Sequence, residues 1–195
     1  MPAHQRADAR RNYLHVLAVA EQELATRGAD ASFEQIARTA GVGSATVRRH
    51  FPSRRALLEA VSRKRVEALH ARALDLAGAA GSDPRRALLD WLDEVVAYCV
   101  RARELAVALS YDGSAQDDSC SATLQEAAEP LLRAAVRHGA VARDVTAADL
   151  IALAVGVTMA TEHRADPAAQ AQRLFRLATE GLSPARPDPA GRAGA

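Results

Sequence analysis

The chain is poor in the residue types that mark several common classes of protein. It has only two cysteines, Cys99 and Cys120, too few and too far apart for a disulfide framework or a zinc site. Only 4% of the residues are aromatic, so leucine, alanine and valine must fill the core that a hydrophobic content of 49% allows. The longest apolar run, residues 150–160, falls well short of the ~20 residues of a membrane-spanning helix. With no N-terminal leader pattern, we expect a soluble cytoplasmic protein with reduced thiols and no membrane partner.

Sequence motifs of catalysis and of metal binding are also missing. There is no glycine-rich phosphate loop, no G-x-S-x-G turn and no pair of catalytic carboxylates. The histidines lack the two-histidine helical spacing of a metal site. The acidic stretch 112–119 lacks the carboxylate spacing of an EF-hand, so we expect a solvated loop there. The sequence therefore predicts no metal, no cofactor and no enzymatic activity.

The net charge of +1 conceals an uneven distribution. Residues 1–66 carry 12 Lys and Arg against 6 Asp and Glu, a net charge of +6. Residues 67–195 carry 13 against 18, a net charge of −5. Positive charge confined to one end of a chain predicts that this end binds nucleic acid.

Apolar residues recur at helical spacing along most of the chain, and no strand pattern is present. Small residues predict a break over 78–83, and Pro84 suits the first turn of the next helix. Pro130 is expected to bend or split its helix. Residues 183–195, with three prolines, are predicted to be disordered. The fold class is therefore all-α, with helices expected at 8–27, 32–40, 44–50, 53–76, 84–101, 103–110, 121–138, 147–163 and 167–181.

Residues 32–51, SFEQIARTAGVGSATVRRHF, have the layout of a helix-turn-helix. Ser32 can cap the first helix with its hydroxyl, and Gly41 can take the left-handed conformation that ends it. Val47 and Phe51, four residues apart, would bury the inner face of the second helix. The outward positions carry small, hydroxyl and cationic side chains, which suit base edges and phosphates. An ordinary helical hairpin with a solvated basic face fits the same twenty residues.

The same stretch resembles the DNA-binding domain of the TetR family of bacterial repressors, T-x-x-x-I-A-x-x-A-G-V-S-x-G-T-L-Y-x-H-F-x-x-K-x-x-L. The matching positions are Ile36-Ala37, Ala40 to Val42, Thr46 and His50-Phe51, and the likeness covers about residues 8–66. It implies an N-terminal three-helix helix-turn-helix domain joined by a long helix to a helical ligand-binding and dimerisation domain. The implied limits are 8–66 for the first domain, 67–182 for the second and 183–195 for the tail.

Four positions depart from the family pattern. Gly43 replaces the serine that caps the recognition helix, and Ala45 replaces a glycine. Arg48 replaces a tyrosine that contacts phosphate in the family, and Arg54 replaces a lysine. The last two exchanges keep or add positive charge, so phosphate contact is preserved in kind. The residues expected to contact DNA are Ser32, Ser44, Ala45, Thr46, Arg48, Arg49, His50 and Arg54.

The resemblance implies a homodimeric transcriptional repressor that binds double-stranded operator DNA and releases it when a small molecule binds. An alternative is a helical ligand-binding or protein-interaction protein that does not bind DNA specifically. An activator, or a regulator without a ligand, would have the same DNA contacts. The basic N-terminal third argues against a protein that no longer binds DNA.

Two sets of residues are expected in the second domain. Helix 147–163 is apolar nearly all round and the last helix has an apolar stripe, so both suit a dimer interface, although they would also close a monomer core. The interface candidates are Leu150, Leu153, Val157, Ala171, Leu174, Phe175 and Ala178. Aromatic residues with a polar edge suit either a ligand pocket or a core. The pocket candidates are Trp91, Val95, Tyr98, Tyr111, Met159 and His163. The effector is expected to be apolar or amphipathic, because no cluster of like charges occurs in 84–163.

Overall fold

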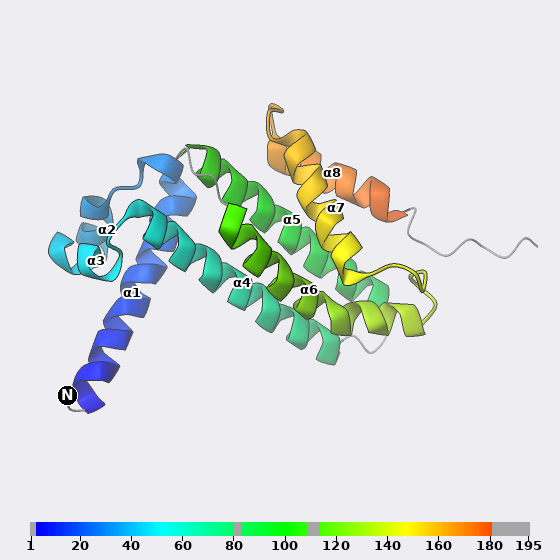
Figure 1. Ribbon diagram of the computed structural model, residues 1–195, viewed down its shortest axis with the longest axis horizontal. Coiled ribbons are helices and arrows are strands. Elements are labelled where there is room, and N and C mark those ends of the chain that lie inside the picture. The colour runs from blue at the N-terminus through cyan, green and yellow to red at the C-terminus, as the bar shows by residue number, and fades with distance from the viewer. Residues whose placement is uncertain (1–2, 80–82, 109–113, 181–195) are drawn as a thin grey trace, which may run out of the picture. The chain divides into compact units, whose positions relative to one another are not determined.

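The computed structural model describes residues 3–79, 83–108 and 114–180, and every regular element in these ranges is a helix (Figure 1). The all-α prediction is confirmed. The elements are α1 (Ala3–Arg27), the short 3-10 helix η1 (Gly28–Asp30), α2 (Phe33–Thr39), α3 (Ser44–His50), α4 (Arg54–Ala79), α5 (Pro84–Ala108), α6 (Ser114–Arg137), α7 (Ala147–Thr161) and α8 (Pro167–Glu180). None of these helices has the length of apolar sequence that crossing a bilayer requires.

Contacts between residues divide the chain into two compact units. The first unit comprises Met1–Ala68 and Val100–Ala122, and the second comprises Leu69–Cys99 and Thr123–Ala195. Helices α4, α5 and α6 each contribute residues to both units. The domain limits expected from the sequence therefore stay a prediction, and the predicted tail 183–195 lies outside the described residues.

The core of the first unit is made by the apolar stripes of α1 to α4. Its buried members come from every one of these helices, as the helical spacing predicts. Tyr13 and Val42 are partly buried and pack against this cluster, so Val42 lies in the corner between α2 and α3 as expected. The buried residues include Val16, Leu17, Ala20, Leu24, Phe33, Ile36, Ala37, Val47, Phe51, Leu57 and Val61.

The turn between α2 and α3 is built as the sequence predicts. Gly41 has φ +66°, a conformation that glycine adopts without a steric penalty. Its N–H donates to the Arg38 carbonyl at 3.2 Å, and the Val42 N–H donates to the Ala37 carbonyl at 3.0 Å. These bonds satisfy carbonyls that the end of α2 would leave without partners. The backbone then enters α3 at Gly43, which caps the helix without a side-chain bond.

In the second unit, α5 buries the face that its spacing predicts. Leu88, Trp91, Leu92, Val95 and Val96 are all buried. The indole Nε1 of Trp91 donates to the carbonyl of Leu69 at 2.8 Å and so joins α5 to α4. Helix α7 begins at a capping box, because the Thr146 hydroxyl accepts from the Asp149 N–H and the Asp149 carboxylate accepts from the Thr146 N–H. The cap at Thr146 was predicted, whereas the reciprocal bond was not.

Several expected helix limits are wrong. Helix α5 continues to Ala108, because residues 101–108 contain arginine, alanine, leucine and no breaker. Helix α6 already begins at Ser114, so 114–119 is helical and not the solvated loop we expected, while 112–113 lie outside the described residues. No glycine or proline occurs between Ser114 and Glu129 to stop it. Pro130 lies inside α6 and does not split it, and buried Leu131 and Leu132 follow directly in the same helix.

Candidate nucleic-acid interface

Helix α3 is held by its inner face and exposes the rest. Val47 and Phe51 are fully buried, with 0% and 1% of their surface exposed. Ser44, Ala45 and Arg49 are exposed and Thr46 is half-buried on the same short helix. Two apolar anchors one turn apart fix the rotation of the helix, and so they decide which side chains a ligand can reach.

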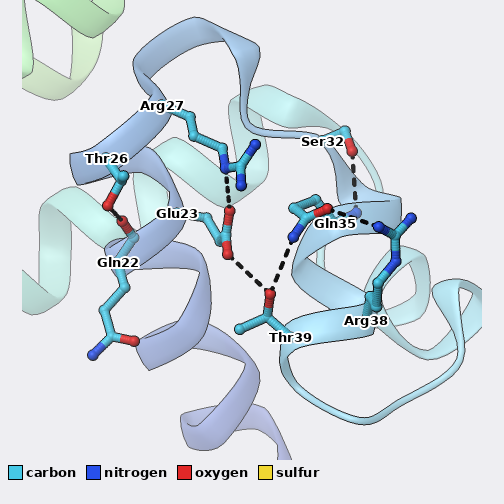
Figure 2. A network of polar contacts seen from close by, with 8 residues as sticks. All are labelled: Gln22, Glu23, Thr26, Arg27, Ser32, Gln35, Arg38 and Thr39. Carbon is cyan, nitrogen blue, oxygen red and sulfur yellow. Dashed lines mark hydrogen bonds and ion pairs between the residues drawn. The ribbon is translucent and has the colours of Figure 1, made fainter.

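A polar network fixes α2 against the end of α1 (Figure 2). The Glu23 carboxylate of α1 accepts from the hydroxyl of Thr39 at 2.9 Å and lies 3.0 Å from the Arg27 Nε. Thr39 also accepts from the Gln35 amide at 3.5 Å, and Gln35 accepts from Arg38 at 3.2 Å. The network joins the C-terminal turns of the two helices, and α2 in turn carries α3.

A second set of charges joins α1 to α4. The Glu21 carboxylate of α1 lies 2.8 Å from the Nζ of Lys64, and its other oxygen pairs with Arg65. The Glu21 side chain is mostly buried, so water screens these pairs less than it screens pairs on the surface. Helix α1 is therefore fastened to α2 at one place and to α4 at another, which gives α3 a rigid support.

Arg48 is not a free side chain on α3. Its Nη2 donates to the Glu34 carboxylate of α2 at 2.6 Å, and its guanidinium lies 5.4 Å from the centre of the Phe33 ring. The Glu34 backbone N–H and the Arg48 side chain both donate to this carboxylate and lower the pKa of Glu34. More than half of the Arg48 side chain stays exposed, so its other donors can reach a phosphate. Sequence reasoning missed this contact, because Glu34 and Arg48 are 14 residues apart.

Three of the expected DNA contacts also have structural partners. The Ser32 hydroxyl accepts from the Gln35 N–H at 3.1 Å and caps α2 as predicted. The ring of His50 lies edge-on to Tyr13 with centroids 5.6 Å apart. Arg54 is the first residue of α4 and is half-buried, just after Ser53 caps that helix through the Ala56 N–H at 3.1 Å. The exposed set is thus centred on Ser44, Ala45, Arg48 and Arg49.

Some of the expected interface residues of α7 and α8 are buried within the protomer, and others are exposed on its surface. The two helices lie side by side in the second unit (Figure 1). Leu150, Ala171 and Phe175 are buried within the protomer, while Leu153 and Val157 are half-buried. Ala178 is exposed, and the exposed large apolar side chains of these helices are Val155, Met159, Leu174 and Leu177. Of these four, only Leu174 was among the interface candidates.

The expected pocket residues do not come together as one cavity lining. Trp91 and Val95 are fully buried, Tyr98 is half-buried, and Tyr111 lies outside the described residues. Met159 has 55% of its surface exposed, and the side chain of His163 is also mostly exposed. A cavity of about 330 Å³ does occur in the second unit, between α5 and α8, and none of the six lines it. In the described part of the chain, no three His, Cys, Asp or Glu side chains gather as a metal site would require.

These features define a helix-turn-helix protein with a second helical unit. A sequence model of bacterial regulatory proteins of the tetR family matches residues 16–61. A second model, the C-terminal domain of SbtR-like transcriptional regulators, matches residues 83–184, more than half of the chain. The chain belongs to the TetR family and is a DNA-binding transcriptional regulator. The alternative of a helical protein without specific DNA binding is not favoured.

Solved structures agree with this assignment. The chain is similar to the TetR transcriptional regulator SCO0520 from Streptomyces coelicolor, with 33% identity over 89% of this chain and 99% of that one and a TM-score of 0.70. A TetR regulatory protein from Mycobacterium vanbaalenii is also 33% identical, over 92% and 99% of the two chains, with a TM-score of 0.67. NalD from Pseudomonas aeruginosa, at 23% identity over 92% and 100% and a TM-score of 0.52, shares the fold. No curated protein sequence matches the chain.

Proposed function

We propose that this regulator is a homodimeric repressor that reads a near-palindromic operator with the two α3 helices of the dimer. The observation that carries this proposal is the exposed face of α3. Ser44, Arg48 and Arg49 lie on this face, and buried Val47 and Phe51 anchor the opposite face. A two-fold dimer places two such helices in successive major grooves. The proposed regulator acts on DNA in the cytoplasm and has no enzymatic activity of its own.

The proposed dimer interface is the outer face of α7 and α8. Val155 and Met159 are one turn apart on α7, and Leu174 and Leu177 share a face of α8. Exposed large apolar side chains on adjacent helices favour association with a second apolar surface. A near-palindromic operator has two equivalent half-sites, so the partner proposed for this apolar face is a second copy of the chain.

Release from the operator by a small molecule is the remaining part of the proposal. Helix α4 contributes to both units, so a change in its tilt can alter the position of α3. A ligand shifts this equilibrium only if it binds one arrangement better than the other. We place the effector in the second unit and expect an apolar or amphipathic compound. A compound that lowers operator affinity in a gel-shift titration tests this step, and an operator affinity that no compound changes would favour a regulator without a ligand.

Operator binding should weaken steeply as salt is raised. Each phosphate that an arginine such as Arg10, Arg48 or Arg54 neutralises releases counterions, with a slope of about −0.9 per contact in log affinity against log salt. Fluorescence anisotropy of a labelled DNA duplex from the region upstream of the regulator's own gene, measured at several salt concentrations, gives the slope. A flat dependence would contradict the assignment of the basic first unit as the DNA-binding surface.

Arg48 and Arg49 should have different roles on DNA. Arg48→Ala should weaken binding to all sequences about equally and reduce the salt slope by about 1, as the loss of a phosphate contact does. Arg49→Ala or Thr46→Ala should relax the preference at individual base pairs, each contact supplying roughly 1–3 kcal/mol of discrimination. Binding to a panel of single-base operator variants separates the two effects. The reverse assignment would mean that α3 lies in the groove with a different rotation.

Glu34→Gln is the matched variant for Arg48. It removes the charge that holds the guanidinium but leaves Arg48 in place. If Arg48 contacts a phosphate, freeing it from Glu34 should preserve or tighten binding to every sequence alike. A change in base preference in Glu34→Gln would instead show that the ion pair itself positions Arg48 for a base.

A further inference from the structure

The first turns of α1 extend beyond the core of the first unit. None of residues 8–12 is buried, and the first buried residue of the helix is Val16. At a rise of 1.5 Å per residue, the segment 3–12 is about 15 Å long. This end of α1 extends past α2 and α3 (Figure 1). The exposed residues 8–11 are therefore open to a partner outside the protein.

Arginine continues the apolar stripe of α1 into this extension. Ala20 and Leu17 are buried in the core, and Tyr13, four residues before Leu17, packs partly buried against it. At the same spacing of three or four residues, the next positions are Arg10 and Arg6. The side of α1 that is apolar against the core thus carries cationic residues where the helix passes beyond the core.

Arg10 lies on the side of α1 that faces the end of α3. Tyr13, three residues later in α1, contacts His50 and Phe51, with ring centroids 5.6 and 5.3 Å apart. Residues three apart lie on the same side of a helix. Arg10 is exposed, and among the residues that the structure describes none forms an ion pair or hydrogen bond with its side chain. Its guanidinium is therefore available to a ligand that lies beside α3.

A DNA duplex offers a second groove at this place. Helix α3 has seven residues and is about 10 Å long, close to the ~12 Å width of the major groove that it is proposed to enter. An extension of about 15 Å that passes the end of α3 is long enough to cross one phosphate backbone and reach the adjacent minor groove. Where A·T base pairs narrow the minor groove, its negative potential is enhanced and attracts arginine side chains.

We propose that Arg10 of each protomer binds the minor groove next to the major groove that α3 reads, and that the regulator therefore prefers A·T base pairs in the flanks of its operator. The inference rests on the proposed binding of α3 to an operator, and it adds a second groove and a longer recognition site. A guanidinium in the minor groove still neutralises backbone charge, so the expected salt dependence is unchanged.

Three duplexes test the flanking contact. Each carries the operator mapped by footprinting upstream of the regulator's own gene, and the three differ only in having A·T, G·C or inosine·C pairs in the flanks. We expect the G·C flanks to bind roughly tenfold more weakly than the A·T flanks, because guanine places an amino group in the minor groove. Inosine lacks this amino group, so its duplex should bind as the A·T duplex does.

The possible failures of this test are distinguishable. Equal binding of the A·T and G·C duplexes would overturn the proposal while leaving operator binding by α3 intact. Inosine flanks that bind as weakly as G·C flanks would place the contact in the major groove and overturn the assignment to the minor groove. If none of the duplexes binds, the proposed operator binding fails as well.

Arg10→Ala and Arg11→Ala are a matched pair of variants. Both residues are exposed on the same part of α1, so neither change disturbs the core. Arg11 is paired with Asp8 and lies about 100° round the helix from Arg10, on the side away from Tyr13. Arg10→Ala should bind the A·T and G·C duplexes equally, whereas Arg11→Ala should keep the preference of the unchanged protein. A flank preference that survives in Arg10→Ala, or that both variants lose alike, would overturn the role of Arg10.

Discussion

Replacing Leu177 with glutamate should convert the proposed dimer into a folded monomer and abolish operator binding. Leu177 is 53% exposed on α8, so the protomer can accommodate a charge there. In a dimer, the same charge would be buried in an apolar seam that offers it no partner. Because a monomer presents only one α3, it loses the gain of two linked contacts, which is roughly 100-fold or more in affinity. Analytical ultracentrifugation and a gel-shift assay measure the two effects.

The matched control is the same substitution at Leu74. This leucine of α4 is 54% exposed, as Leu177 is, but it lies outside α7 and α8. Leu74→Glu should remain dimeric and bind the operator normally. A dimeric Leu177→Glu variant that still binds DNA would show that the face of α7 and α8 is not the interface.

Phe175 cannot serve for this test, although its position in the stripe of the last helix made it an interface candidate. Only 1% of its surface is exposed, and it lies in the protomer core, where it also borders the cavity of the second unit. A glutamate at this position would unfold the protomer, and loss of the dimer would follow for a different reason. The periodic pattern identifies an apolar face, but it does not distinguish a face that packs within the chain from one left for a partner.

The helix-turn-helix was predictable because its determinants are local. Ser32, Gly41, Val47 and Phe51 lie within twenty residues, and each acts on its own turn or on the adjacent helix. The position of Arg48 was not predictable in the same way. Its partner Glu34 lies on another helix, and the two meet only because buried Val47 sets the rotation of α3. Base-contacting residues could be proposed from sequence, whereas the contacts that position them could not.

The second unit was harder to predict because its features depend on pairs of distant segments. The cavity combines α5 with α8, which are joined by a hydrogen bond between residues 94 positions apart. The burial of Asp93 Oδ1 gave no signal in the sequence, because Asp93 lies among Asp90 and Glu94 on what is otherwise a charged stretch of the helix. Trp91 was interpreted as either pocket or core, and the carbonyl that its indole reaches belongs to α4.

Trp91→Ala should destabilise the protein more than any other single truncation discussed above. Trp91 is fully buried and is among the largest side chains of the core, so its removal leaves a cavity that costs about 3–5 kcal/mol. The loss of its bond to Leu69 adds less, because that carbonyl is within α4 and can still accept from the helix backbone. A loss of this size is a large part of the roughly 5–15 kcal/mol that stabilises a typical domain. Urea denaturation followed by circular dichroism measures it, since the variant has no tryptophan to report by fluorescence.

Trp91→Phe keeps one aromatic ring in the core and removes the donor together with the rest of the indole, so it loses the hydrogen bond but only part of the packing. It should cost much less than Trp91→Ala, and equal losses in the two variants would mean that the bond to Leu69 carries the effect. This distinction governs how effector experiments are interpreted. A Trp91→Ala protein that fails to respond to a compound has lost part of its core, so its failure does not place the compound beside Trp91.

Tyr98→Phe is the sharper probe, since Tyr98 is only half-buried and the change removes a hydroxyl without opening a void. Lost response in Tyr98→Phe with unchanged stability would place the effector on α5, and a normal response would leave the cavity between α5 and α8 as the site to test.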